Sequence, residues 1–226
     1  MSSGFEPTAR YAVYWVPARA HPLWAAGCAW LGRDPELGEA GTAPAWGAEP
    51  WRYGFHATLK APLRLREGCS EAAFCAAVAK LAARQARFAM PALRVDWLDG
   101  FLALRPEQPP AAAHPLRQLA DACVTSLDEF RATMGAPELA RRAAGLAEAQ
   151  LAALQRWGYP HVLQHWRFHM TLSDRLPPEP AALQQRAEAA FAAALAQPLM
   201  LEEVSVFVEA RPGTPLRLLQ RFKLGD

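Results

Sequence analysis

Two short segments of the chain place a histidine and a threonine two residues apart, His56-Ala57-Thr58-Leu59 and His169-Met170-Thr171-Leu172. Side chains at positions i and i+2 of a β-strand lie on the same face, so each segment offers an imidazole beside a hydroxyl. The intervening Ala57 and Met170, with the leucines that follow, are expected to point the other way into the core. The two segments begin 113 residues apart, which indicates one site made from two copies of the same half.

A pair of imidazoles is suited to displacement at phosphorus. Histidine titrates near neutrality, so one imidazole accepts a proton from the attacking water while the other donates a proton to the leaving oxygen. The hydroxyls of Thr58 and Thr171 are then placed to bind the non-bridging phosphate oxygens. We predict that His56 and His169 are catalytic, and the mechanism needs no metal and no other cofactor.

Four more residues near the two segments are candidates for binding the substrate. Arg167 precedes the second segment by two residues and Lys60 follows Thr58 by two, so both share the catalytic face if the strands are regular. A cation there neutralises phosphate charge, whereas such side chains more often reach solvent from the end of a strand. We favour phosphate binding for Arg167 and weigh the two readings of Lys60 equally. Arg52 and Tyr53 precede the first segment and are expected at the mouth of the cleft.

Hydrophobic periodicity predicts the same order of elements around both segments. Each is preceded by a strand and a helix and followed by a helix and a strand. We therefore expect one bilobal domain over residues 1–226, with lobe-forming repeats at about 9–100 and 101–226. The expected strands are 11–16, 92–98, 101–104, 201–209 and 216–222, and the expected helices are 22–31, 70–88, 180–196 and one that begins at 115.

Two irregular stretches interrupt this pattern. An insertion over about 131–158 lengthens the second half, and Pro137 is suited to the first turn of a helix within it. The loop 32–51 is rich in Gly, Pro and Ala and carries Trp46 and Trp51. A loop of this length is either a surface excursion pinned by its tryptophans or a wall over the site. We favour the second because the loop leads into His56.

Composition limits the classes of protein. The chain has 226 residues, 52% of them hydrophobic, and a formal charge of +2, so no strong field draws it to nucleic acid or to an anionic membrane. We find no secretory signal and no apolar run of the ~18–20 residues that a membrane span needs. The four cysteines show no CxxC spacing, which is typical of reduced core residues. We expect a cytoplasmic protein.

Three histidines recur at four-residue steps, His161, His165 and His169. On a helix this spacing indicates a metal-binding face. Pro160 precedes them, and the residues between them read as extended, which places successive histidines about 13 Å apart. That separation is too large for one zinc ion, so we expect no metal site.

The two histidine segments together resemble the motifs of the 2H phosphoesterase superfamily, which is named for two H-x-[T/S]-x motifs on paired lobes. Longer stretches are similar to an uncharacterised family of that superfamily encoded beside phosphonate-utilisation genes. The resemblance implies an α+β fold of two pseudo-symmetric lobes, each an antiparallel sheet with helices outside, around a central cleft. It also implies an enzyme that hydrolyses a cyclic phosphodiester without a metal. The similar stretches are 30–34, 52–62, 156–160 and 167–172.

Three functions remain open at this stage. The favoured one is a hydrolase that opens a small cyclic phosphodiester, and the family's genomic association points to a ribosyl 1,2-cyclic phosphate that also carries a 5-phosphate. A second is a 2′,3′-cyclic phosphodiesterase or ligase-like enzyme acting on RNA ends, against which the near-neutral charge counts. The third is a non-catalytic phosphate-binding protein, against which the two intact motifs count. We expect a small-molecule cyclic phosphate as the partner, with no nucleic acid, membrane or obligate protein partner.

Overall fold

An antiparallel sheet of seven strands runs through the part of the chain that the computed structural model describes, residues 9–38 and 41–225. The strand order is β4-β5-β6-β2-β1-β8-β9, and the short strands β3 and β7 pair separately. The strands are β1 (Arg10–Trp15), β2 (Ala57–Leu63), β3 (Phe88–Ala89), β4 (Leu93–Leu98), β5 (Phe101–Pro106), β6 (Met170–Thr171), β7 (Met200–Leu201), β8 (Glu203–Glu209) and β9 (Arg217–Lys223).

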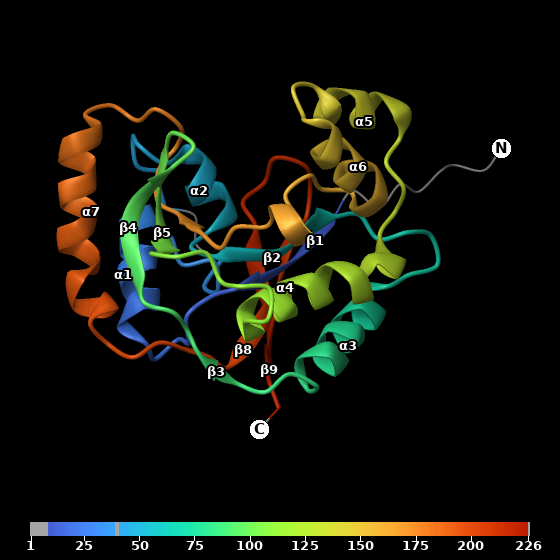
Figure 1. The fold of residues 1–226 in the computed structure, drawn as a ribbon, viewed down its shortest axis with the longest axis horizontal. Helices are drawn as coiled ribbons and strands as arrows, with labels where there is room; N and C mark the ends of the chain where they lie inside the picture. The colour runs from blue at the N-terminus through green and yellow to red at the C-terminus, as the bar shows by residue number, and fades with distance from the viewer. Residues whose placement is uncertain (1–8, 39–40, 226) are drawn as a thin grey trace.

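Helices flank this sheet in two pairs (Figure 1). Helix α1 packs against α7 beside β4, whereas α3 and α4 pack together and contact β2, β8 and β9. The expected α+β class, with antiparallel strands and helices outside, is confirmed. The helices are α1 (Pro22–Leu31), α2 (Ala48–Tyr53), α3 (Glu71–Ala82), α4 (Pro115–Ser126), α5 (Ala136–Ala143), α6 (Glu148–Trp157) and α7 (Pro180–Leu195), with 3₁₀ turns η1 (Asp128–Phe130) and η2 (Leu163–His165).

Each lobe of the sheet contains strands from both halves of the chain. Strand β4, from the first half, pairs with β5, and strand β8, from the second half, pairs with β1. The helix pairs are mixed in the same way, since α1 contacts α7 and α3 contacts α4. The two halves of the chain are therefore intertwined, with the β2–β6 pair at the centre of the sheet.

The predicted elements differ from the observed ones where the chain turns earlier than periodicity indicates. Helix α3 ends at Ala82 rather than near Phe88, because Phe88 pairs with Leu201 in the small sheet. The insertion contains two helices, α5 and α6, instead of one. They are separated by a turn at Gly145, whose φ of +76° lies in the left-handed region that favours glycine.

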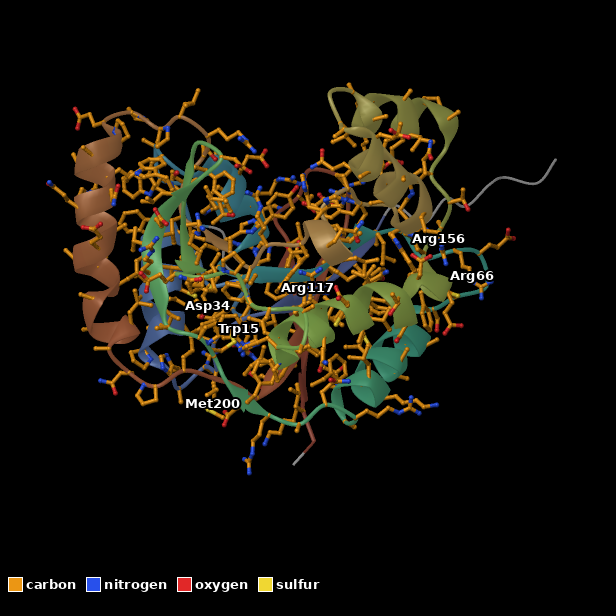
Figure 2. The ribbon with its side chains drawn as sticks, in the orientation of Figure 1. Trp15, Asp34, Arg66, Arg117, Arg156 and Met200 are labelled. Atoms are coloured by element: carbon orange, nitrogen blue, oxygen red, sulfur yellow. The ribbon has the colours of Figure 1, made fainter. Side chains whose placement is uncertain are left out.

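The main hydrophobic core lies between the sheet and the helices. Trp15 of β1 is 1% exposed and lies in the interior of the molecule (Figure 2). As the alternation of the two histidine segments predicts, Ala57, Leu59, Met170 and Leu172 are all buried in this core. The histidine and threonine of each segment are only partly buried.

A close approach between Gly27 of α1 and Phe55 fixes the chain just before His56. Phe55 is fully buried and stacks on Phe191 of α7 with ring centroids 5.8 Å apart. A Cβ atom at Gly27 would lie 2.1 Å from the Phe55 ring. The glycine therefore gives the space that lets Phe55 anchor the entrance to β2.

We expect Gly27→Ala to destabilise the protein by about 1–3 kcal/mol, because the added methyl group overpacks the core. Helix propensity alone predicts the opposite, a gain of about 1 kcal/mol. Urea denaturation measures the free energy of unfolding. Gly135→Ala is the matched control, since a Cβ there meets its nearest atom at 3.8 Å. A Gly27→Ala protein as stable as the wild type would contradict the close approach.

Candidate active site

One β-bridge brings the two histidine segments together. Ala57 of β2 pairs with Met170 of β6 in antiparallel orientation. In such a ladder the residues on either side of the pair are also opposite one another, so His56 faces Thr171 and Thr58 faces His169. Because side chains alternate, all four project from one face of the sheet while Ala57 and Met170 are buried on the other.

Both imidazoles are held in the same tautomer. His56 Nδ1 lies 2.8 Å from the Gly54 carbonyl oxygen, and His169 Nδ1 lies 2.8 Å from the Arg167 carbonyl oxygen. A carbonyl accepts only, so each Nδ1 donates and each Nε2 of the neutral ring is left as a base. Each histidine thus bonds the carbonyl two residues before it. The Thr58 hydroxyl lies 3.2 Å from His56 Nε2 and donates to it.

His56 lies in a buried aromatic environment. Its ring stacks on Tyr14, with centroids 3.7 Å apart, and lies near Tyr53 and Phe207 at 6.2 and 6.4 Å. Burial, with a smaller contribution from the nearby His169, lowers the pKa of His56 to about 4 against the opposing effect of the Gly54 carbonyl. The His56 imidazole is therefore neutral at pH 7 and suited to accept a proton.

His169 lies in a more charged environment. Its ring is 5.6 Å from Phe101, and Arg167 forms an ion pair with Asp99 at the β4–β5 turn. Burial lowers the pKa of His169, and so do the charges of Arg167 and His161, while the hydrogen bond to the Arg167 carbonyl and, less strongly, Asp99 oppose the shift. Asp99 therefore partly offsets the cations around this imidazole.

A cavity of about 150 Å³ adjoins His169 and Thr58. Of the predicted binding residues, Arg167 also lines it. No residue of 32–38 or 41–51 does, so the described part of the long loop forms no wall of this cavity. The loop instead packs Trp46 against Trp30, with ring centroids 5.3 Å apart.

Eight lining residues were not predicted as site residues from the sequence. Four of them carry polar groups that matter most here, Tyr159, His161, His165 and Arg175. The 3₁₀ turn η2 compacts the chain between His161 and His169, so these histidines line one cavity instead of lying far apart on a strand. Arg175 stacks its guanidinium over Phe101, 5.4 Å from the ring centroid, and donates to the Asp99 carbonyl. The four-residue spacing of His161, His165 and His169 is visible in the sequence. On an extended chain that spacing places the histidines far apart, so it did not predict that they line one cavity.

Lys60 does not line this cavity. The register shifts by one residue between the pairs Tyr14–Thr58 and Val13–Lys60, which is a β-bulge. A bulge reverses the alternation of side chains, so Lys60 leaves the face that carries Thr58. Its ammonium donates to the Val124 carbonyl at 2.9 Å, and burial lowers its pKa to about 8.

Arg52 and Tyr53 lie beside His56 at the end of α2. Arg52 Nη1 donates to the buried Glu209 at 2.9 Å, and its guanidinium lies over the Tyr53 ring. Burial alone would raise the pKa of Glu209, but hydrogen bonds from Arg10 and from the Gly213 amide lower it below its usual value. Tyr53 therefore borders the imidazole, and Arg52 is bound to a carboxylate next to it.

Buried hydrogen bonds hold both segments in place. The Trp166 indole donates to the Thr58 carbonyl and the Trp30 indole donates to the Leu172 carbonyl, each at 2.8 Å. Arg33, which is 5% exposed, donates to the Trp51 carbonyl at 2.8 Å and so fixes the end of α2. The chain then turns through Gly54, whose φ of +80° presents its carbonyl to His56. The imidazole and hydroxyl positions are thus set by main-chain contacts.

Two further searches of the described residues bear on the class of protein. No group of three or more His, Cys, Asp or Glu side chains within 9–38 and 41–225 is placed to hold a metal ion. Among the same residues, no helix has both the length and the apolar character that crossing a membrane requires.

Two curated proteins are similar to this chain, and both are described as "Ribose 1,5-bisphosphate phosphokinase PhnN". The protein from Janthinobacterium sp. (strain Marseille) is 40% identical over 233 residues, which cover 96% of this chain and 51% of that protein. The protein from Laribacter hongkongensis (strain HLHK9) is 39% identical over 218 residues, which cover 92% and 50%. The chain therefore spans about half the length of the curated relatives it matches.

Solved structures with a similar arrangement include a phosphoesterase, at 17% identity and a TM-score of 0.48, covering 96% of this chain and 99% of that one. E. coli LigT complexed with 3'-AMP aligns at 17% identity and a TM-score of 0.47, covering 97% and 99%. A family described as "Protein of unknown function (DUF1045)" matches residues 58–217. That match contains Thr58 and Leu59 of the first histidine segment and the whole of the second, and the chain belongs to the DUF1045 family.

Proposed function

We propose that this protein is a metal-independent hydrolase that opens a small cyclic phosphodiester by general acid–base catalysis between His56 and His169. The observation that carries the proposal is the Ala57–Met170 bridge, which puts two imidazoles and two hydroxyls on one face. In both imidazoles Nε2 is the unprotonated nitrogen, because both Nδ1 atoms donate to carbonyls, and at His56 this nitrogen accepts from the Thr58 hydroxyl. A site that only bound phosphate would not need two imidazoles oriented in this way.

In the proposed reaction water attacks the phosphorus atom in line with the ring oxygen that leaves. His56 Nε2 takes a proton from the water as its oxygen bonds to phosphorus. His169 Nε2–H gives a proton to the ring oxygen as its bond to phosphorus breaks, so the product is a phosphomonoester with a free hydroxyl. The Thr58 hydroxyl turns from His56 Nε2 to the substrate, so that Thr58 and Thr171 both donate to the non-bridging oxygens, and Arg167 offsets their charge.

The environments of the two histidines favour this assignment of roles. The pKa of His56 is lowered to about 4, so its neutral form is present throughout the physiological range. His169 lies beside the Asp99 carboxylate, which opposes the lowering of its pKa. A bound anionic phosphate raises the pKa of both imidazoles and favours a protonated His169 in the complex.

A pentose phosphate is the substrate class that we favour. The two curated relatives are described as acting on ribose 1,5-bisphosphate, and this chain matches about half of each. Opening a 1,2-cyclic phosphate of ribose 5-phosphate yields that bisphosphate when the O2 oxygen leaves. The match therefore supports a ribosyl 1,2-cyclic phosphate as substrate, with the ring phosphate retained on O1.

The substrate is tested by assaying purified protein with a panel of cyclic phosphates and identifying the product by phosphorus NMR. We expect turnover of 5-phosphorylated ribosyl 1,2-cyclic phosphate to ribose 1,5-bisphosphate. A product phosphorylated on O2 would reverse the assigned leaving group. Faster turnover of RNA ends carrying 2′,3′-cyclic phosphates would favour the RNA-processing alternative, and no turnover of any cyclic phosphate would favour a binding protein.

Replacing either histidine should remove most of the activity. We expect His56→Ala and His169→Ala each to lower kcat about 10²–10⁴-fold, the range of one acid or base step. The double variant should be little worse than either single one, since both act on one displacement. Thr58→Ala and Thr171→Ala should cost about tenfold, the loss of one hydrogen bond.

His21→Gln is the matched control for the histidine variants, because His21 caps α1 by accepting from the Leu23 amide. Its kcat should equal that of the wild type. EDTA should leave the rate unchanged. Full activity of His169→Ala, or activity that chelation removes and zinc restores, would rule out the two-histidine mechanism.

The pH profile should reflect the lowered pKa values. In the free enzyme, His56 must be neutral, with its pKa at about 4, and His169 must be protonated, with its pKa below the usual 6.5. The kcat/KM profile is therefore expected to be bell-shaped with its maximum on the acid side of pH 6.5, and the kcat profile to lie at higher pH because bound phosphate raises both values. A kcat/KM that stays constant from about pH 5 to about pH 9 would contradict this assignment.

A further inference from the structure

A second pocket lies next to the histidine site, on the far side of Tyr159. Six of the residues that line it are Arg10, Lys60, Arg64, Arg131, Arg142 and Tyr159, and we call it the cationic pocket. Tyr159 also lines the cavity that holds His169 and Thr58, so the two spaces share a wall. The cationic pocket is not part of the proposed reaction site.

The cationic pocket has more positive than negative charge. Five cations line it, Arg10, Lys60, Arg64, Arg131 and Arg142, beside one carboxylate, Glu138, and each carboxylate that pairs with these cations is shared by two or more of the cations in or near the pocket. Glu138 pairs with Arg64 and Arg142, Glu209 with Arg10 and Arg52, and Asp128 with Lys60, Arg131 and Arg156. The formal charge of the whole chain is only +2, so this excess is local. Clustered, partly buried cations repel one another unless an anion offsets them.

The inserted segment supplies much of this pocket. Arg142 lies on α5, Arg131 lies just before it, and Tyr159 follows α6. Arg156 of α6 reaches from the insertion to Asp128 of η1, near the end of α4 (Figure 2). The insertion is held to α4 by an apolar cluster of Ala153, Val162 and Val124, so its docking does not rest on the charged pairs.

We propose that the cationic pocket binds a second phosphate group, one that the cyclic phosphate substrate carries away from the reacting ring. This inference rests on the proposed function. The pocket and the histidine site are joined by β2, where Thr58 borders one and Lys60 the other. The β-bulge between them turns Lys60 away from the cavity at Thr58 and toward the cationic pocket. Arginine side chains are suited to bidentate binding of a phosphate dianion.

Tyrosine rings border both sites. Tyr14 stacks on His56 with ring centroids 3.7 Å apart, and Tyr159 lines both the cavity at His169 and the cationic pocket. A substrate with one phosphate between the histidines and another in the cationic pocket would pass along these tyrosines. The binding energy of the second phosphate then orients the reacting one.

The test compares two substrates, ribosyl 1,2-cyclic phosphate with and without the 5-phosphate. For the wild type we expect a higher kcat/KM with the 5-phosphate. Arg142→Gln and Arg64→Gln should lower the ratio of the two kcat/KM values roughly tenfold or more, because each removes a charge-assisted contact to the second phosphate. Arg141→Gln is the matched control, since Arg141 is the exposed neighbour of Arg142 on α5 and should keep the wild-type ratio.

An unchanged ratio in Arg142→Gln and Arg64→Gln, or an equal loss for both substrates, would overturn the second phosphate site. Turnover of the substrate that lacks the 5-phosphate also shows whether each variant is folded. If the wild type turns over neither substrate, the proposed function fails and the pocket is tested by calorimetric titration with inorganic phosphate. Binding that Arg142→Gln weakens and Arg141→Gln does not would still support the pocket, and binding that both variants retain would reject it.

Discussion

The arrangement of this protein depends on one antiparallel pair, Ala57 with Met170, that joins the two lobes of the sheet. The pair is short, so little of its stability comes from ladder hydrogen bonds. Burial of both side chains in the core and the Trp166 indole on the Thr58 carbonyl hold it in register. A slip of one residue in either strand would turn its histidine and threonine into the core, so the same packing that stabilises the sheet also sets the site.

The two histidine segments are alike in sequence, yet their surroundings make them chemically different. His56 is stacked on Tyr14 in an apolar setting, whereas His169 lies among Arg167, His161 and Asp99. Acid and base roles require two groups whose environments differ, and two copies of one motif do not provide that difference alone. The intertwining of the halves provides it, because each histidine is surrounded by elements that the other half does not duplicate.

Much of the fold could be predicted from the sequence, because amphipathic periods and proline starts are local signals. They identified α1, α3, α4 and α7 and most of the long strands. The side-chain alternation of the two segments also predicted the shared face. What could not be predicted depends on distant contacts. The bulge that turns Lys60 away from Thr58 is visible only against β1, and the turn η2 that brings His161 toward His169 is set by packing on α4. Pairing across the two halves has no local signature either.

In the insertion, ion pairs and apolar contacts contribute differently to stability. Half-exposed ion pairs such as Arg64–Glu138 and Arg142–Glu138 contribute little to stability, typically below about 1 kcal/mol each. The apolar contacts of Val162 with Val124 hold the segment in place instead. The excess cations are not needed to hold the insertion on α4. They destabilise the free protein, because like charges are held close together. A dianion bound beside Tyr159 removes that cost, which makes anion binding and order in the insertion mutually reinforcing.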